Sequence, residues 1–349
     1  MSHHLNIRSF ARWETLLVLV LLGLGWLGMR LSPAFLSAQN FANLTVAEME
    51  IAITAIPMTL IIIAGEIDLS VESMVGLSSA VLGFLWAAGV PLWADVALVL
   101  IMGALGGWLN GILVMRAGLP SLVVTLGSLA LFRGLASVVL GPRAISNFPA
   151  QFTAFGFGNV PRTPVPWPLV VFGVLAVVFG LMLHRTWLGR QVFAVGKNQA
   201  AARYSGVPVV RLKIGLFVLS GVVSALAGVI LTSRLSSARA DAGQGMTLAV
   251  VTAVLLGGVN IFGGSGTIPG VALAIFTLAV LQNALRLADV STELQSISVG
   301  LLLIVSVVVP NAARQVALLV RRPGRRSSRP LLASGAVQSA PKPEEEAAR

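Results

Sequence analysis

The stretch IIIAGEIDLSVESMVGLSS, residues Ile61–Ser79, places the carboxylates of Glu66, Asp68 and Glu72 between two apolar runs. Ionisable groups at membrane depth are costly, so they face a charged partner, a water-filled cavity or the aqueous end of a helix. Gly65 and Gly76 allow the backbone of other segments to approach closely here. The stretch therefore predicts a polar break between two membrane-spanning helices.

Further apolar stretches on both sides of this break are long enough to cross a bilayer, which takes about 20 residues per helix. The whole chain is 56% hydrophobic and only 11% charged over 349 residues. We expect an all-α polytopic membrane protein with about ten transmembrane helices, which excludes a large globular catalytic domain. The ten stretches are Trp13–Gly28, Leu44–Ala64, Val71–Gly89, Leu92–Met115, Leu119–Leu140, Trp167–His184, Ile214–Thr232, Met246–Phe262, Ile268–Leu285 and Leu294–Pro310.

The 24 basic and 13 acidic residues indicate an orientation. If the N-terminus is inside, 17 basic residues fall on inner segments and six on outer loops, while Arg133 lies within a span. Both termini are then cytoplasmic. We expect a cytoplasmic segment at 1–12, a transmembrane domain at 13–310 and a disordered cytoplasmic tail at 311–349. The arginine run of the tail suits anionic lipid rather than nucleic acid.

Several classes of chemistry lack the residues they need. The chain has no cysteine and three histidines, which leaves no thiolate nucleophile and no metal cluster. The glycine-rich segment 257–270 resembles a phosphate cradle, but no Gly-Lys-Ser/Thr follows it, so we read it as a close turn between helices. No His-Glu-x-x-His or Gly-x-Ser-x-Gly supports an intramembrane enzyme. We therefore expect no cofactor, metal or ATP site in this chain.

The longest inner connection before the tail is 185–213, which reads RTWLGRQVFAVGKNQAAARYSGVPVVRLK. Asn198 is a suitable N-cap, Gln199–Ser205 is alanine-rich, and Gly206 followed by Pro208 supplies a stop. A short helix between two spans suits a membrane subunit that a soluble protein must push. These signals fit equally well an ordinary surface loop whose basic residues only orient the protein in the membrane.

Three motifs, in the right order between about Trp13 and Pro310, resemble one family. The permease subunits of ABC importers for ribose, xylose, rhamnose and autoinducer-2 carry patterns similar to residues 196–213, 65–73 and 257–270. The resemblance is greatest to the rhamnose and autoinducer-2 branch. Glu66 and Glu72 depart from the pattern, because they stand where the family has glycines.

This resemblance implies a membrane permease subunit of an ATP-driven importer in the bacterial plasma (inner) membrane. Its partners would be a second permease, as a homodimer or heterodimer, with two ATPase subunits or one tandem ATPase that hold ATP and Mg. An extracytoplasmic binding protein would deliver the substrate, which would be rhamnose, autoinducer-2 or a pentose. The segment 185–213 would contain the helix that couples to the ATPase, through Gly196, Asn198, Ala201, Ala202, Ser205 and Gly206.

Polar residues within the spans are candidates for gating or for the substrate path. Asp68 could instead be the N-cap of the third span, and Arg133 needs a carboxylate, a carbonyl or a watery cavity. The competing function is an ion-coupled secondary transporter that acts alone, for which Asp68 is the one attractive carboxylate. The candidates are Asp68, Ser70, Asn110, Arg133, Asn260 and Asn283.

Overall fold

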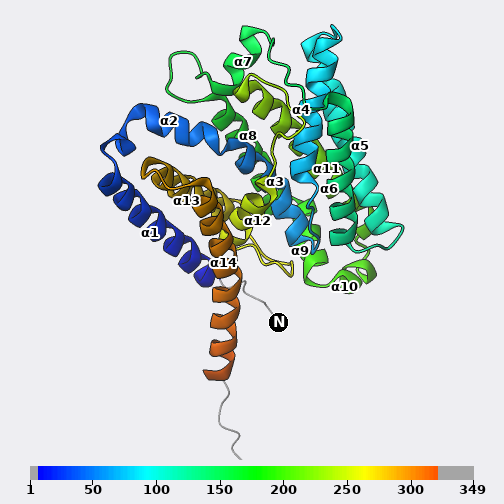
Figure 1. The fold of residues 1–349 in the computed structure, drawn as a ribbon. Helices are drawn as coiled ribbons and strands as arrows, with labels where there is room; N and C mark the ends of the chain where they lie inside the picture. The colour runs from blue at the N-terminus through cyan, green and yellow to red at the C-terminus, as the bar shows by residue number, and fades with distance from the viewer. Residues whose placement is uncertain (1–6, 321–349) are drawn as a thin grey trace, which may run out of the picture. The chain divides into compact units, whose positions relative to one another are not determined.

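The computed structural model describes residues 7–320, which contain fourteen α-helices and one short 3-10 helix. Within that range no β-strand is present, and two isolated β-bridges join loop residues. The chain divides into one compact unit, residues 1–309, and a second at 310–349. The prediction of an all-α polytopic protein is confirmed (Figure 1).

Each of the ten predicted spans overlaps a helix, but Met246–Phe262 runs past the end of α12 at Leu256, and Leu44–Ala64 covers the bend between α2 and α3. Six helices are long and apolar enough to cross a membrane by themselves, and the pair α2–α3, bent by 41°, makes a seventh. The helices α4, α12 and the apolar part of α14 are shorter. The bounds are α1 Ile7–Leu31, η1 Pro33–Leu36, α2 Ala38–Ala47, α3 Met49–Ile63, α4 Val71–Ala87, α5 Leu92–Met115, α6 Ser121–Leu140, α7 Ala150–Phe157, α8 Trp167–Arg185, α9 Trp187–Lys197, α10 Gln199–Tyr204, α11 Val209–Leu235, α12 Met246–Leu256, α13 Ile268–Leu287 and α14 Thr292–Val320.

Helix α11 is central to the first unit, because it packs against α3, α4, α5 and α7. Its contact with α5 depends on glycines at small-xxx-small spacing. A Cβ added at Gly103 or Gly107 would collide with the backbone of α11, and one at Gly111 would lie 2.9 Å from the Ile214 Cα. The two helices therefore meet backbone to backbone, which fixes α11 as a rigid element.

The connections between the spans partly follow the sequence expectations. The loop 141–166 contains only one short helix, α7, and residues 257–267 form the expected close turn, with positive φ at Gly258, Gly263 and Gly264. Helix α9 was not foreseen. Helix α14 continues to Val320, past the predicted end at Pro310, so the expectation of a disordered tail at 311–349 is wrong for residues 311–320, and residues 321–349 lie outside the described residues.

Candidate functional site

The polar break between α3 and α4 is organised by Asp68, which is 2% exposed. Its Oδ1 accepts hydrogen bonds from the Ser70 backbone N–H at 3.0 Å and from the Ser70 hydroxyl at 2.6 Å. Its Oδ2 accepts from the Ser220 hydroxyl on α11 at 2.8 Å. The carboxylate thus satisfies donors from the turn and from the central helix. The interpretation of Asp68 as the N-cap of α4 is wrong. Ser70 occupies the N-cap position, and Asp68 lies in the turn that precedes the helix.

The network extends from Ser70 to two further helices. The Asn110 side-chain amide on α5 donates to the Ser70 hydroxyl at 2.9 Å, and the Ser128 hydroxyl on α6 donates to Asn110. Asp68, Ser70, Asn110 and Ser128 are all buried. Paired buried polar groups of this kind fix the relative position of helices. The structure therefore brings together three of the candidates, Asp68, Ser70 and Asn110, as a structural junction.

On one side of this junction, Glu66 meets the 185–213 segment. The Lys213 ammonium lies 2.5 Å from Glu66 Oε1 and donates to Gln199 Oε1, on α10, at 2.6 Å. Lys213 is only 2% exposed. The end of α9 adds a second contact, because Gly196 lies directly against the carbonyl of Ile63.

On the other side of the junction, Glu72 binds Arg133 and the start of α12. The Arg133 guanidinium on α6 donates to Glu72 Oε1 at 2.8 Å. Glu72 Oε2 accepts from the backbone N–H groups of Gly245 and Thr247, each at 3.1 Å. A carboxylate at a helix N-terminus satisfies free N–H groups and the helix dipole. Arg133 thus has the carboxylate that its position in a span requires.

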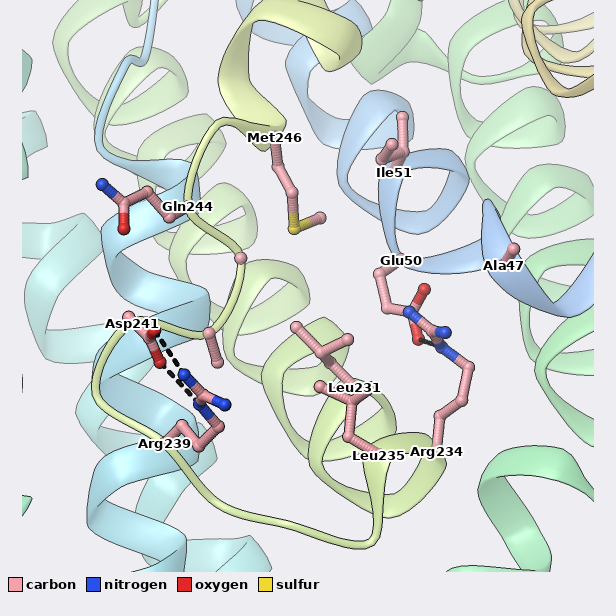
Figure 2. A pocket seen from close by; sticks show the side chains of 12 residues that line it. Ala47, Glu50, Ile51, Leu231, Arg234, Leu235, Arg239, Asp241, Gln244 and Met246 are labelled. Carbon is pink, nitrogen blue, oxygen red and sulfur yellow. Dashed lines mark hydrogen bonds and ion pairs between the residues drawn. The ribbon is translucent and has the colours of Figure 1, made fainter. Parts of the chain in front are cut away.

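Arg133 also lines a large cavity of about 740 Å³. A smaller cavity of about 330 Å³ lies beside it, and both are lined by Arg239, Asp241 and Gln244 from the non-helical segment 236–245. Figure 2 shows this segment between α11 and α12, with the Met246 side chain directed into the smaller cavity. The smaller cavity lies at the end of α11 that carries Arg234, and the large one shares with it the segment that follows α11. The other end of α11, about 40 Å away for a helix of 27 residues, begins at the 185–213 segment.

Ion pairs surround the cavities. Arg239 and Asp241 form two hydrogen bonds, at 2.8 and 2.7 Å, and this exposed pairing lowers the pKa of Asp241 below its ordinary value. Arg234 on α11 donates to Glu50 on α3 at 2.7 Å (Figure 2). The lining therefore offers both donors and acceptors to a polar molecule.

The 185–213 segment presents a polar surface away from the core. The Asn198 side chain accepts from the Ala201 backbone N–H at 2.9 Å, which confirms the predicted cap of α10. Tyr204 is 92% exposed, and a shallow cavity of about 350 Å³ is lined by Gln199, Ala200, Arg203 and Tyr204. Of the predicted coupling residues, Ala202 is buried and Gly196 packs inward, while the exposed ones are Asn198, Ala201, Ser205 and Gly206.

Two candidates lie apart from the junction and the cavities. Asn260 holds the glycine-rich turn by donating to the Gly263 carbonyl at 3.1 Å. Asn283 on α13 exchanges two amide hydrogen bonds with Asn40 on α2, at 2.9 and 3.2 Å. Both amides therefore pair with nearby protein groups.

Sequence reasoning missed the partners that complete the site. Ser220 and Ser128 are ordinary helix residues in sequence, and Lys213 has no signal of its own beyond its place at the end of the 185–213 segment. The pairings of Glu66 with Lys213 and of Glu50 with Arg234 join residues 147 and 184 positions apart. The only signal was the rarity of charge in apolar spans, which demands partners without naming them. Among the described residues, no group of three His, Cys, Asp or Glu could hold a metal.

Comparison with known proteins identifies a matching family and similar proteins. The family described as branched-chain amino acid transport system / permease component matches residues 40–307. The Autoinducer 2 import system permease protein LsrD of Yersinia enterocolitica is 40% identical over 311 residues, which are 87% of this chain and 93% of that protein. Its namesake from Yersinia pseudotuberculosis is 41% identical over 264 residues, 74% of this chain and 79% of that protein. No solved structure gives a significant match.

Proposed function

The chain belongs to the family of permease components of branched-chain amino acid transport systems, and we propose that it is the membrane subunit of an ATP-driven importer for a small sugar-like molecule. It is a multi-pass protein of the bacterial inner membrane and a transport component rather than an enzyme. The observation that carries the proposal is the 40% identity to an import permease across almost the full length of both chains.

The 185–213 segment docks the ATPase in this proposal. Its helix α10 is capped by Asn198 and exposes Tyr204, Ala201 and Ser205 away from the core. The rest of the segment is fixed to the end of α3 through Gly196 on α9 and to Glu66 through Lys213 on α11, and Lys213 also binds Gln199 of α10. A helix that is exposed on one side and anchored on the other can transmit a push from a soluble partner to the spans. The segment and both termini are then cytoplasmic, in agreement with the basic residues.

The substrate enters through the cavities at the opposite end of α11. The large cavity, about 740 Å³, has the size of a small-molecule site. Its lining by Arg133, Arg143, Arg239, Asp241 and Gln244 combines donors with acceptors. A polyhydroxylated molecule needs both, because each hydroxyl donates and accepts. Arg133 is the one candidate for the substrate path that lines this cavity.

Autoinducer 2 is the first substrate to test, because the relatives are named for its import. Rhamnose and pentoses follow as sugar-like alternatives. The working assembly is a pair of permeases, with two ATPase subunits or one tandem ATPase that bind ATP and Mg, and with an extracytoplasmic binding protein. The domain arrangement that goes with it is a permease domain at 13–310 between cytoplasmic ends.

Reconstitution tests this function directly. Proteoliposomes that contain the chain, its partner permease and the ATPase, with the binding protein outside, are expected to accumulate autoinducer 2 only with ATP and Mg inside. We expect genes for an ATPase and a sugar-binding protein beside this one, and those genes would supply the components. Uptake by this chain alone, driven by a proton or sodium gradient, would show that it is a secondary transporter and would refute the proposal.

A further inference from the structure

Glu66 occupies a position between the 185–213 segment and the Asp68 junction. Two contacts fasten this segment to the end of α3 and the turn after it. Gly196 lies against the Ile63 carbonyl, and Lys213 binds Glu66. The first is a backbone contact, so the Glu66 carboxylate supplies the charged side-chain link of the two.

The link is buried, which makes it strong and specific. The Lys213 side chain is 3% exposed and that of Glu66 16%, whereas both members of the Arg239–Asp241 pair are 54% exposed. An exposed pair contributes little, but removal of one partner from a buried pair leaves an uncompensated charge. Lys213 also donates to Gln199 in the first turn of α10, so the ammonium joins α10, α11 and the turn.

The same short turn continues to the cavities. Two residues after Glu66, Asp68 holds Ser220 on α11. Four residues further, Glu72 holds Arg133 in the wall of the large cavity and the start of α12. The turn and the first residues of α4 therefore connect the 185–213 segment to the cavity wall, and Glu66, Asp68 and Glu72 each bind another helix along the way.

We infer that Glu66 is a positioning residue that transmits movement of α10 to the Asp68 junction and to the cavity wall. The inference rests on the proposed function. When α10 moves, Lys213 moves with it and shifts Glu66. The turn then transmits this shift to Glu72 and Arg133. Two discrete arrangements of such a packed network can link the two ends of a protein.

The test compares transport with ATP hydrolysis in the full reconstituted complex, with autoinducer 2 as the transported probe. Glu66→Gln and Lys213→Glu are each expected to leave ATPase association and ATP hydrolysis in place and to lower molecules transported per ATP by about tenfold, within the range of known coupling energies. The double variant Glu66→Lys with Lys213→Glu restores the opposite charges and is expected to recover the ratio to within about twofold. A merely structural role would instead lower the yield of folded complex and leave the number of molecules transported per ATP unchanged.

Controls separate the possible failures. Arg116→Met removes an exposed charge outside the 185–213 segment and is expected to keep the wild-type ratio. Gln199→Ala removes only the second acceptor of Lys213, and it serves if Lys213→Glu does not fold; it is expected to lower the ratio less than Glu66→Gln. An unchanged ratio in Glu66→Gln, or the absence of rescue in a folded double variant, overturns the inference. Failure of the wild-type complex to transport with ATP overturns the proposed function instead.

Discussion

Arg133 on α6 donates to Glu72 on α4 across 2.8 Å, while the other Glu72 oxygen accepts from two backbone N–H groups at the start of α12. One carboxylate thus joins three helices beside the large cavity. It neutralises an arginine within a span and replaces the water that would otherwise satisfy a helix N-terminus.

Replacement of this carboxylate destabilises the fold. Glu72→Gln leaves Arg133 without its counter-ion and weakens the attachment of α12, so we expect the free energy of unfolding to fall by about 2 kcal/mol, less than for a fully buried pair. The midpoint of thermal unfolding of the purified chain in detergent measures this. Asp241→Asn is the matched control, because it removes one partner of an exposed pair worth about 0–1 kcal/mol. Equal shifts in the two variants would contradict the prediction.

Two buried carboxylates should respond in opposite ways to the same change. Asp68 accepts three hydrogen bonds, whereas neither oxygen of Asp95 on α5 has a partner among the described residues. Asp68→Asn is expected to lower the free energy of unfolding by about 2 kcal/mol, because hydrogen bonds to a charged acceptor are lost. Asp95→Asn removes an unpaired buried charge and is expected to leave stability unchanged or higher. A larger loss for Asp95→Asn in the same thermal assay would refute this assignment.

The backbone contact between α5 and α11 predicts a contrast between two glycines. A methyl group at Gly107 would meet the Phe217 backbone, whereas one at Gly127 on α6 meets nothing within 4 Å. Gly107→Ala therefore forces the helices apart and is expected to cost about 1–3 kcal/mol. Gly127→Ala is expected to stabilise its helix by up to about 1 kcal/mol. Thermal midpoints and the yield of monodisperse protein measure both, and similar behaviour of the two variants would disprove the close contact.

The docking role of α10 predicts a loss of association without a loss of folding. Ala201 is exposed on α10, so Ala201→Glu leaves the core intact and places a charge on the proposed ATPase surface. We expect unchanged membrane insertion and loss of co-purification with the ATPase. Ala150→Glu, at an exposed position on α7, is the matched control and is expected to keep the ATPase. Normal co-purification of the Ala201→Glu variant with the ATPase would show that α10 is not part of the docking surface.

The apolar pattern predicted the spans well because hydrophobicity over about 20 residues is a local property. Every predicted stretch overlaps a helix, and Asn198 caps α10 as its residue type suggests. The bend between α2 and α3 was less accessible, because it falls at Glu48 with neither glycine nor proline beside it. The end of α12 at Leu256 has a local cause, since Gly257 and Gly258 follow it.

The site was predictable only in part, for the same reason. The carboxylates of the polar break were visible as expensive groups, but their partners lie on helices far along the chain. The partner of Asp68 on α11 is 152 positions away, and Asn283 pairs with Asn40 at a separation of 243. No periodicity encodes such pairs, so Asn283 looked similar to Asn110 although only Asn110 belongs to the junction.

The short helix α12 has a consequence for how the protein enters the bilayer. Its 11 residues extend about 16 Å, roughly half of a hydrocarbon core, and the non-helical segment 236–245 precedes it. The backbone of that segment is satisfied by earlier parts of the chain, as where Ala238 exchanges hydrogen bonds with Ile145 and the Arg239 N–H donates to Ser79. Such a piece cannot reside in lipid by itself. We therefore expect α12 to remain outside the hydrocarbon during synthesis until α4 and α11 are already assembled to receive it.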